Sequence, residues 1–360
     1  MSRTWRHSLA LAVVLLLTVA ACGDGSAEST TTTTPGTTTT EASTTTPEAS
    51  TTTTPETSTT EASFPARLDE HATITVTAGL QGLPYLPMVV AAEEGLFEDN
   101  NLTVEFVETA GTNAVTAVAA GQADITITLP ENIVNAWAQG APLKIIGATV
   151  TENLYRLYVG NDIETLDDLA GKLLGMFNEG NGTHIQLAWL LDEEGAGSAE
   201  STFVAVGGLA DRLASLQNDQ ISGTLLFPSF DVQAERAGLR ELAAMKDYVD
   251  GYPNEVIAVT ETTIAERPEV LRAFLDALIR GGDLIKSDPE RAIAIAAETS
   301  GTEFSVIEEG FEFMKDTFAY DARVDPGGLQ WTIDVVVEYA SLPKVPTTED
   351  LYDDSLLPEG

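Results

Sequence analysis

The chain has 360 residues, with 56 Asp and Glu against 18 Lys and Arg, and a formal net charge of -38. A protein this acidic repels phosphate backbones and anionic membrane surfaces, which excludes nucleic acid as a partner. Its single cysteine, Cys22, leaves no internal disulfide and no cysteine-based metal centre.

The N-terminal segment has the three parts of a bacterial lipoprotein signal. Arg3 and Arg6 give a positive start, residues 9–19 form an almost unbroken apolar run, and Val19-Ala20-Ala21-Cys22 is a small-residue cleavage site. The alternative is a transmembrane helix, which needs ~20 apolar residues, more than this run provides. We therefore predict that residues 1–22 are a signal peptide and that the lipid on Cys22 is the only membrane contact. The protein would be extracytoplasmic, at the outer face of the bacterial cell membrane.

Residues 23–65 consist almost wholly of Thr, Ser, Pro, Glu and Ala. Because this composition has no apolar periodicity to offset the entropy of ordering, we predict a disordered linker between the lipid and the folded body. Its Ser, Thr and Pro content also permits O-glycosylation, which the sequence leaves open.

The folded body starts with an alternation of strands and helices. Period-two patterns predict strands, and helix-forming runs ending near Gly95 and Gly121 predict helices between them. The expected strands are 73–78, 102–106, 125–128 and 143–150, and the expected helices are 86–97, 113–122 and 131–139. This order predicts a mostly parallel sheet with helical crossovers.

A second set of the same kind follows. Strands are expected at 173–177, 201–206 and 221–227, helices at 183–194 and 209–218, then a strand at 256–259 and helices at 268–285 and 289–298. Pro268 and Pro289 suit first-turn positions, and Asp288 is a candidate N-cap. We therefore predict an α/β protein of two lobes, each a mostly parallel sheet flanked by helices, whose chain crosses between the lobes and returns.

Several segments resemble one family of transport proteins. They are the run LPYLPMVVAAEEGLFEDNNLTVEF at 83–106, Gly111-Thr112-Asn113, AAGQADI at 119–125, LDDLAGK at 166–172, and residues 267–297. In these segments the chain resembles the solute-binding proteins for sulfonates, nitrate, taurine and thiamine precursors. The resemblance covers nearly the whole body.

The resemblance implies a type II periplasmic-binding fold and an ATP-driven (ABC) importer, whose permease and ATPase subunits would be the partners. It implies lobe I at 66–157 and 255–360, lobe II at 158–254, and hinge strands at 155–159 and 255–259. Where relatives carry Gln/Lys-Val-Asp-Ala, this chain has Gln220-Ile221-Ser222-Gly223. With that aspartate missing, the family pattern does not identify the ligand.

In open parallel sheets, ligands sit beyond the carboxyl ends of the strands, where helix N-termini present unpaired N–H groups. The segments in that position are 81–85, 111–113, 129–132, 178–184 and 227–231. We expect ligand contacts from Gln81, Leu83, Pro84, Tyr85, Gly111, Thr112, Glu131, Asn132, Asn178, Glu179, Asn181, Thr183, Phe227, Ser229 and Asp231.

Each of these residues also has a purely structural interpretation. Thr112, Asn132 and Thr183 can equally serve as helix caps, and Tyr85 can serve packing alone. His184 is suited to a hydrogen bond at a helix start, and with three histidines in the chain we expect no metal site.

Enzymatic function is not expected. The sequence has no Gly-x-Ser-x-Gly elbow, no Gly-x-Gly-x-x-Gly fingerprint, no phosphate-binding Gly-Lys-Ser/Thr loop and no His-Glu-x-x-His pair. It also lacks the cysteine-rich iron motif of the pyrimidine-forming enzymes that resemble this family. We expect no cofactor. A surface sensory module is an alternative to import.

The charges in the five segments favour one kind of ligand. The segments contain no Lys or Arg, but they contain Glu131, Glu179 and Asp231, which repel anions and attract N–H groups. We therefore predict a neutral or cationic nitrogen heterocycle, such as a thiamine-pyrimidine precursor. A sulfonate, nitrate or taurine held by helix N-termini is the alternative.

Overall fold

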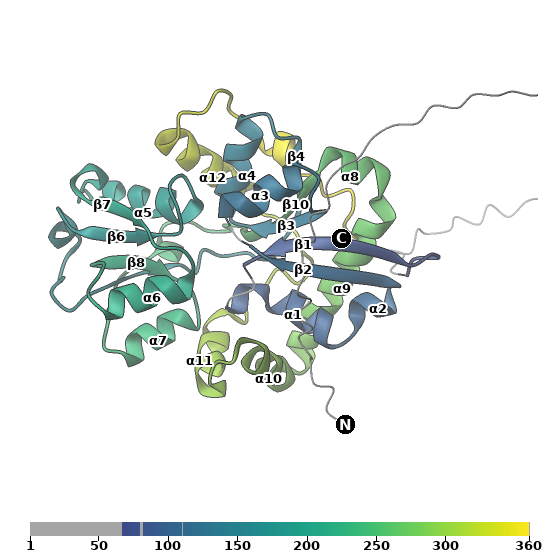
Figure 1. Ribbon diagram of the computed structural model, residues 1–360, viewed down its shortest axis with the longest axis horizontal. Coiled ribbons are helices and arrows are strands. Elements are labelled where there is room, and N and C mark those ends of the chain that lie inside the picture. The colour runs from purple at the N-terminus through teal and green to yellow at the C-terminus, as the bar shows by residue number, and fades with distance from the viewer. Residues whose placement is uncertain (1–66, 80–81, 110, 360) are drawn as a thin grey trace, which may run out of the picture. The chain divides into compact units, whose positions relative to one another are not determined.

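The computed structural model describes residues 67–79, 82–109 and 111–359. The predicted signal peptide with Cys22, the linker and Gln81 lie outside these ranges. Within them, the chain from residue 67 onward forms two α/β lobes, each built on a five-stranded sheet (Figure 1). None of the helices in the described ranges is long and apolar enough to cross a membrane.

The sheet of the first lobe has the strand order β2-β1-β3-β10-β4. The strands β1, β2 and β3 are parallel, and β10 runs antiparallel to both β3 and β4. The predicted strands of this lobe are confirmed. Their bounds are β1 (Ala72–Ala78), β2 (Leu102–Glu108), β3 (Ile125–Thr128), β4 (Leu143–Val150) and β10 (Asn254–Thr260).

The helices of this lobe start or stop at residues that suit helix ends. The predicted helix at 86–97 is broken in two because Gly95 has φ 71°, a left-handed conformation that glycine adopts without steric cost. Pro130 occupies the first turn of α4, where its missing N–H costs nothing. The bounds are η1 (Leu83–Tyr85), α1 (Leu86–Glu93), α2 (Leu96–Asp99), α3 (Gly111–Ala119), α4 (Pro130–Ala138) and α8 (Glu261–Glu266).

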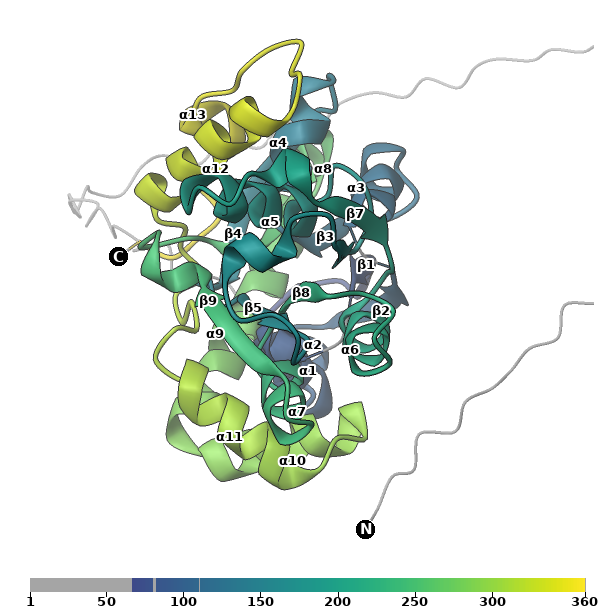
Figure 2. The ribbon, with the colours of Figure 1, turned by 90° about the vertical axis from the view of Figure 1, so that its left-hand side faces the viewer.

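The second lobe repeats this plan with the order β7-β6-β8-β5-β9, in which β6 is parallel to β7 and β8 while β5 is antiparallel to β8 and β9. Figure 2 shows α5 and α6 on opposite sides of β8, so both faces of the sheet are covered. The bounds are β5 (Arg156–Val159), β6 (Leu173–Met176), β7 (Thr202–Ala205), β8 (Gly223–Leu226), β9 (Arg240–Ala244), η2 (Leu166–Leu169), η3 (Ser198–Glu200), η4 (Met245–Asp247), α5 (Gly182–Glu193), α6 (Leu209–Gln217) and α7 (Phe230–Arg236).

In each sheet the antiparallel strand is the one that has just arrived from the other lobe. The strand β5 follows β4 after residues 151–155, and β10 follows η4 after residues 248–253. Both strands are paired along both edges, so they belong to the sheets. The hinge strands predicted at 155–159 and 255–259 therefore lie mostly inside the lobes, and the short segments before them connect the two lobes.

The chain ends in helices that pack against both lobes. The long helix α9 buries one stripe, with Leu271, Phe274 and Leu278 inside the first lobe. Asp288 caps α10 as predicted, accepting a hydrogen bond of 3.2 Å from the Arg291 N–H. The bounds are α9 (Pro268–Ser287), α10 (Pro289–Ser300), α11 (Phe304–Met314), α12 (Pro326–Tyr339) and α13 (Thr348–Leu351).

One apolar cluster continues from the second lobe into the terminal helices. It contains Leu187 of α5 and Leu213 of α6 together with Ile293 of α10 and Phe311 of α11. Figure 1 shows α10 and α11 below the junction of the lobes, next to α7. Apolar burial across this junction stabilises the lobe arrangement that forms the site.

Candidate ligand-binding site

A cavity of about 410 Å³ lies between the two lobes. It is bounded by residues that follow the carboxyl ends of β1, β2, β3, β6, β7 and β8, the edge at which open α/β sheets bind ligands. Its volume is in the range of small-molecule sites. It is lined by Gly79, Pro84, Tyr85, Glu108, Thr109, Gly111, Asn113, Ile127, Thr128, Leu129, Asn132, Tyr155, Phe177, Asn181, Thr183, Gly208, Leu209, Asp211, Arg212, Phe227 and Glu255.

The sequence-predicted site residues divide into two groups, apart from Gln81, which lies outside the described residues. Those that line the cavity are Pro84, Tyr85, Gly111, Asn132, Asn181, Thr183 and Phe227. Those that do not line it are Leu83, Thr112, Glu131, Asn178, Glu179, Ser229 and Asp231. The rule about strand ends therefore places the segments at the cavity, but it does not fix which way each side chain points.

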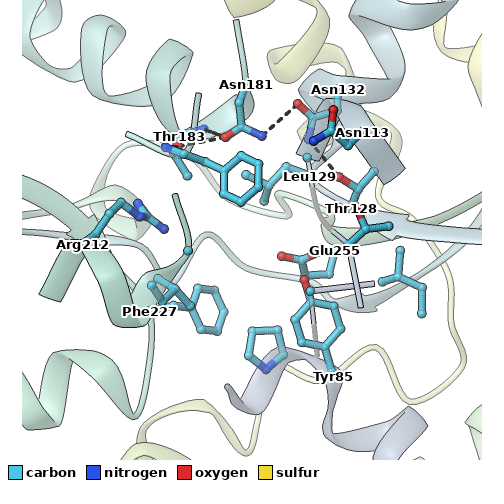
Figure 3. A pocket seen from close by; sticks show the side chains of 18 of the residues that line it. Tyr85, Asn113, Thr128, Leu129, Asn132, Asn181, Thr183, Arg212, Phe227 and Glu255 are labelled. Atoms are coloured by element: carbon cyan, nitrogen blue, oxygen red, sulfur yellow. Dashed lines mark hydrogen bonds between the residues drawn. The ribbon is translucent and has the colours of Figure 1, made fainter. Parts of the chain in front are cut away.

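Two helix N-termini meet at one side of the cavity and join the lobes (Figure 3). The Asn181 side chain caps α5, accepting 2.9 Å from the Thr183 N–H, and its amide donates 3.1 Å to Asn132 Oδ1 on α4. Asn132 in turn donates 2.8 Å to Thr128 Oγ1. The cap of α5 is therefore Asn181, a predicted ligand contact, and not Thr183, for which the sequence left capping open. The same Asn181 side chain joins the lobes.

A glycine permits this close approach of the lobes. Gly111 has φ 61°, and a Cβ there would lie 2.7 Å from Cε1 of Phe177 in the other lobe. Nearby, Asn178 donates 3.2 Å to Thr112 Oγ1, a second contact between lobes that lies outside the cavity wall.

Glu131 is turned away from the cavity into a buried network. Its carboxylate accepts hydrogen bonds from the Tyr252 hydroxyl at 2.9 and 3.0 Å and from Gln186 Nε2 at 2.9 Å. Burial raises the pKa of the Glu131 carboxyl to about 7. Glu131 thus links α4, α5 and the segment that returns to the first lobe.

The other two predicted acidic contacts also lie elsewhere. Asp231 is buried, 3.5 Å from Arg156 Nη1, and Arg156 lies over the Phe313 ring at 3.6 Å. Burial raises the pKa of Asp231 to about 6, although Arg156 opposes the rise. Glu179 is exposed and borders a separate hollow beside α12. None of the three carboxylates on which the ligand prediction rested lines the cavity.

Leu83 and Ser229 serve packing. A Cβ on Gly310 of α11 would lie 2.8 Å from the Ser229 backbone nitrogen and 3.1 Å from Leu83 Cδ1, so the three residues are in close contact. Leu83 is 1% exposed and Ser229 is 2% exposed. Both residues lie next to the cavity and pack against α11 without lining the cavity.

Glu255 is the buried carboxylate that does line the cavity, and the sequence did not single it out as a contact. It is 5% exposed and its Oε2 has no partner. Burial raises the pKa of Glu255 to about 7, with the neighbouring Tyr85 acting against the rise. Its φ of 53° is left-handed, a strained conformation typical of functional positions.

Arg212 adds to the cavity wall a basic side chain from outside the five predicted segments. It lies on α6 and is 2% exposed, its Nη1 donates 2.8 Å to the Leu225 carbonyl, and Nε has no partner. Burial lowers the pKa of the guanidinium, and Tyr155 opposes this. The sequence did carry a signal: Arg212 shares a helix face with Leu209, Leu213 and Leu216, all buried.

Aromatic rings form much of the remaining wall. Tyr155 and Phe227 meet edge to face with ring centroids 5.2 Å apart, and Tyr85 and Phe177 also line the space. Figure 3 shows Phe227, Tyr85 and the Glu255 carboxyl facing the same space. Such a wall suits a flat ring. Among the residues the structure describes, His, Cys, Asp and Glu form no group of three or more that could hold a metal ion.

The fold is a pair of α/β lobes with a cavity between them. The chain belongs to the NMT1/THI5-like family, whose model matches residues 84–292. The chain is also similar to a Haemophilus influenzae protein named provisionally for thiamine biosynthesis, at 25% identity over 212 residues, which are 57% of this chain and 66% of that protein. The alignment thus spans just under two thirds of that relative.

Solved structures show the same fold. The alkanesulfonate-binding protein of Xanthomonas axonopodis pv. citri, bound to MOPS, is 19% identical with a TM-score of 0.69 and covers 79% of this chain and 100% of that chain. The periplasmic nitrate-binding protein of Synechocystis is 14% identical with a TM-score of 0.67 and covers 79% and 87%. The predicted family and the two-lobe periplasmic-binding fold are therefore confirmed.

Proposed function

We propose that this chain is the extracytoplasmic solute-binding component of an ABC importer, and that its cavity holds a small nitrogen-containing ring such as a thiamine-pyrimidine precursor. The family and the two-lobe fold support the transport role, and the permease and ATPase subunits would be its partners. The name of the Haemophilus relative supports the choice of a thiamine-related ligand.

One observation carries the ligand class: the Oε2 atom of Glu255 has no hydrogen-bond partner in a cavity walled by aromatic rings. A buried carboxylate oxygen without a partner is costly, and an amino group or ring N–H on a ligand would satisfy it. Among the described residues that line the cavity, the carboxylates are those of Glu108, Asp211 and Glu255, and the guanidinium is that of Arg212. This balance favours a neutral or cationic ligand.

The sequence supports the location. The signal at 1–22 and the linker at 23–65 would tether the body by lipid on Cys22 to the outer face of the membrane. In this proposal the lobe bounds shift slightly from those expected from the sequence, because Arg156 and Leu157 pair in the second sheet and Asn254 pairs in the first, and bending occurs at residues 151–155 and 248–253. The ligand would hold the lobes closed for recognition by the permease.

An anion such as a sulfonate or nitrate is the second candidate, because Arg212 lines the cavity and its buried Nε has no partner. Here the guanidinium would supply the charge that such ligands require. The carboxyl of Glu255 disfavours it when ionised. A sensory role on the cell surface would use the same binding site, and adjacency of permease and ATPase genes would separate it from import.

A thermal-shift screen of the detergent-solubilised, full-length protein against aminopyrimidines, alkylamines, sulfonates and nitrate tests the proposal. We expect stabilisation by aminopyrimidines and little by nitrate or simple sulfonates. Stabilisation by sulfonates or nitrate alone would assign the cavity to anions. No stabilisation by any of the four classes would contradict a solute-binding role for these classes.

A further inference from the structure

Two residues that line one cavity each carry a buried polar atom without a partner. Among the described residues, several buried side chains have unpaired atoms, but only those of Glu255 and Arg212 belong to residues that line the cavity. Each unsatisfied buried group costs free energy, and charged groups cost more than neutral ones. Because both occur in the same space, one bound molecule can satisfy both.

Each of the two groups is already held in place by the protein. Tyr85 lies beside the Glu255 carboxyl, whose Oε2 has no partner. The Leu225 carbonyl accepts from Arg212 Nη1 at 2.8 Å, which leaves Nε. A side chain fixed by a neighbour loses little further freedom when a ligand binds, so both atoms are preorganised.

The two groups also come from different lobes. Glu255 opens β10 in the first sheet, and Arg212 lies on α6 of the second lobe. Figure 3 shows the two side chains on opposite sides of the space, Arg212 on the side of Phe227 and Glu255 on the side of Tyr85. A ligand that contacts both therefore bridges the lobes.

We propose that the ligand is bipolar: a flat ring with an amino or N–H group that donates to Glu255 and, at its other end, an anionic oxygen group that accepts from Arg212. This inference rests on the proposed function and deepens it by naming a second recognition group. A ligand with only one of the groups would leave the other buried side chain unsatisfied. The site therefore selects a ligand with an N–H donor at one end and an anionic oxygen acceptor at the other.

The test uses three probes built on one ring. They are an aminopyrimidine carboxylate with its two substituents para to each other, the same aminopyrimidine without the carboxylate, and the pyrimidine carboxylate without the amino group. Calorimetric titration of the full-length protein should show that the bipolar probe binds roughly ten-fold or more tightly than either single-ended probe.

Two variants test which end of the bipolar probe contacts which side chain. Arg212→Gln should lower the affinity for the bipolar probe to that for the aminopyrimidine, while Glu255→Gln should lower it to that for the pyrimidine carboxylate. Glu179→Gln is the control, because Glu179 is exposed outside the cavity, and it should leave all three affinities unchanged. If Arg212→Gln does not fold, the affinities of the three probes for the unaltered protein still decide whether the site prefers a bipolar ligand.

The outcomes separate the inference from the proposed function. Equal affinity for the bipolar probe and the aminopyrimidine would overturn the inference and leave the proposed function standing. Equal affinity for the bipolar probe and the pyrimidine carboxylate would overturn the inference in favour of a plain anion. Binding of none of the three would contradict both.

Discussion

Asn181 and Asn132 belong to different lobes, and the amide of Asn181 donates a hydrogen bond of 3.1 Å to Asn132 Oδ1 at the edge of the cavity. Since Asn181 Oδ1 also accepts from the Thr183 N–H, one side chain both caps α5 and joins the lobes. A carboxylate in its place can keep the cap but cannot donate. The two roles can therefore be separated by one substitution.

We expect Asn181→Asp to weaken ligand binding by about 1–2 kcal/mol, because the closed arrangement loses a buried hydrogen bond and gains repulsion at Asn132 Oδ1. Calorimetry with an aminopyrimidine measures the affinity. Asn218→Asp, at an exposed helix end within the second lobe, is the control and should bind like the parent. Equal affinities for Asn181→Asp and the parent would contradict the joining role.

Glu131 predicts a pH dependence of stability. Its pKa is about 7 in the folded protein and 4.5 for an unperturbed glutamate, so the folded state binds the proton more tightly. The resulting stabilisation is fully present below pH 4.5 and is lost as the pH rises through 7. The loss amounts to about 3 kcal/mol at most.

Glu131→Gln removes this titration. Urea unfolding between about pH 5 and about pH 8 should show the parent losing more stability with rising pH than the variant does. Glu255, whose pKa is also about 7, contributes a similar slope to both proteins and cancels in the comparison. Identical slopes in the two proteins would show that Glu131 is not protonated more readily in the fold.

Arg156 neutralises a buried carboxylate. Arg156→Gln leaves Asp231 unpaired at 2% exposure and removes the cation that lies over the Phe313 ring, so we expect a loss of about 3 kcal/mol in the free energy of unfolding. Arg236→Gln, which breaks an exposed pair with Glu309, should cost less than about 1 kcal/mol. Equal losses in denaturant titration would contradict the buried pairing.

Substitution of Cys22 tests whether lipid anchors the protein to the membrane. Replacing it by Ser removes the predicted lipid site, and because the linker separates this position from the body, the protein should leave the membrane fraction without a change in its thermal midpoint. Fractionation followed by immunoblotting measures the distribution. Membrane retention of Cys22→Ser through high-salt washing would rule out lipid on Cys22 as the anchor.

Much of the fold could be predicted because its central strands alternate regularly and are bounded by helix signals. The strands that the patterns missed are peripheral or short: β9 (Arg240–Ala244) carries mixed polar and apolar residues at a sheet edge, and β5 (Arg156–Val159) was interpreted as a hinge. Their place depends on pairing with strands distant in the sequence. Local periodicity does not encode that pairing.

The site was less predictable because the topology places the segments, whereas partners distant in the sequence determine where each side chain points. Topology put 129–132 and 227–231 beside the cavity, but Glu131 turns toward Tyr252 and Asp231 toward Arg156, partners that lie far away in the chain. Glu255 stands at the start of an apolar strand, where nothing local marks it as a ligand contact. Its role follows from the left-handed backbone and the neighbouring Tyr85, which only the structure shows.

The most direct test of the central claim is a calorimetric titration of an aminopyrimidine into the parent protein, Glu255→Gln and Glu179→Gln. Glu255→Gln should weaken binding by about 1.5–3 kcal/mol, the contribution of a charged hydrogen bond, while Glu179→Gln should bind like the parent. The opposite pattern, with Glu255→Gln binding as tightly as the parent or more tightly, would show that this carboxylate does not receive the ligand.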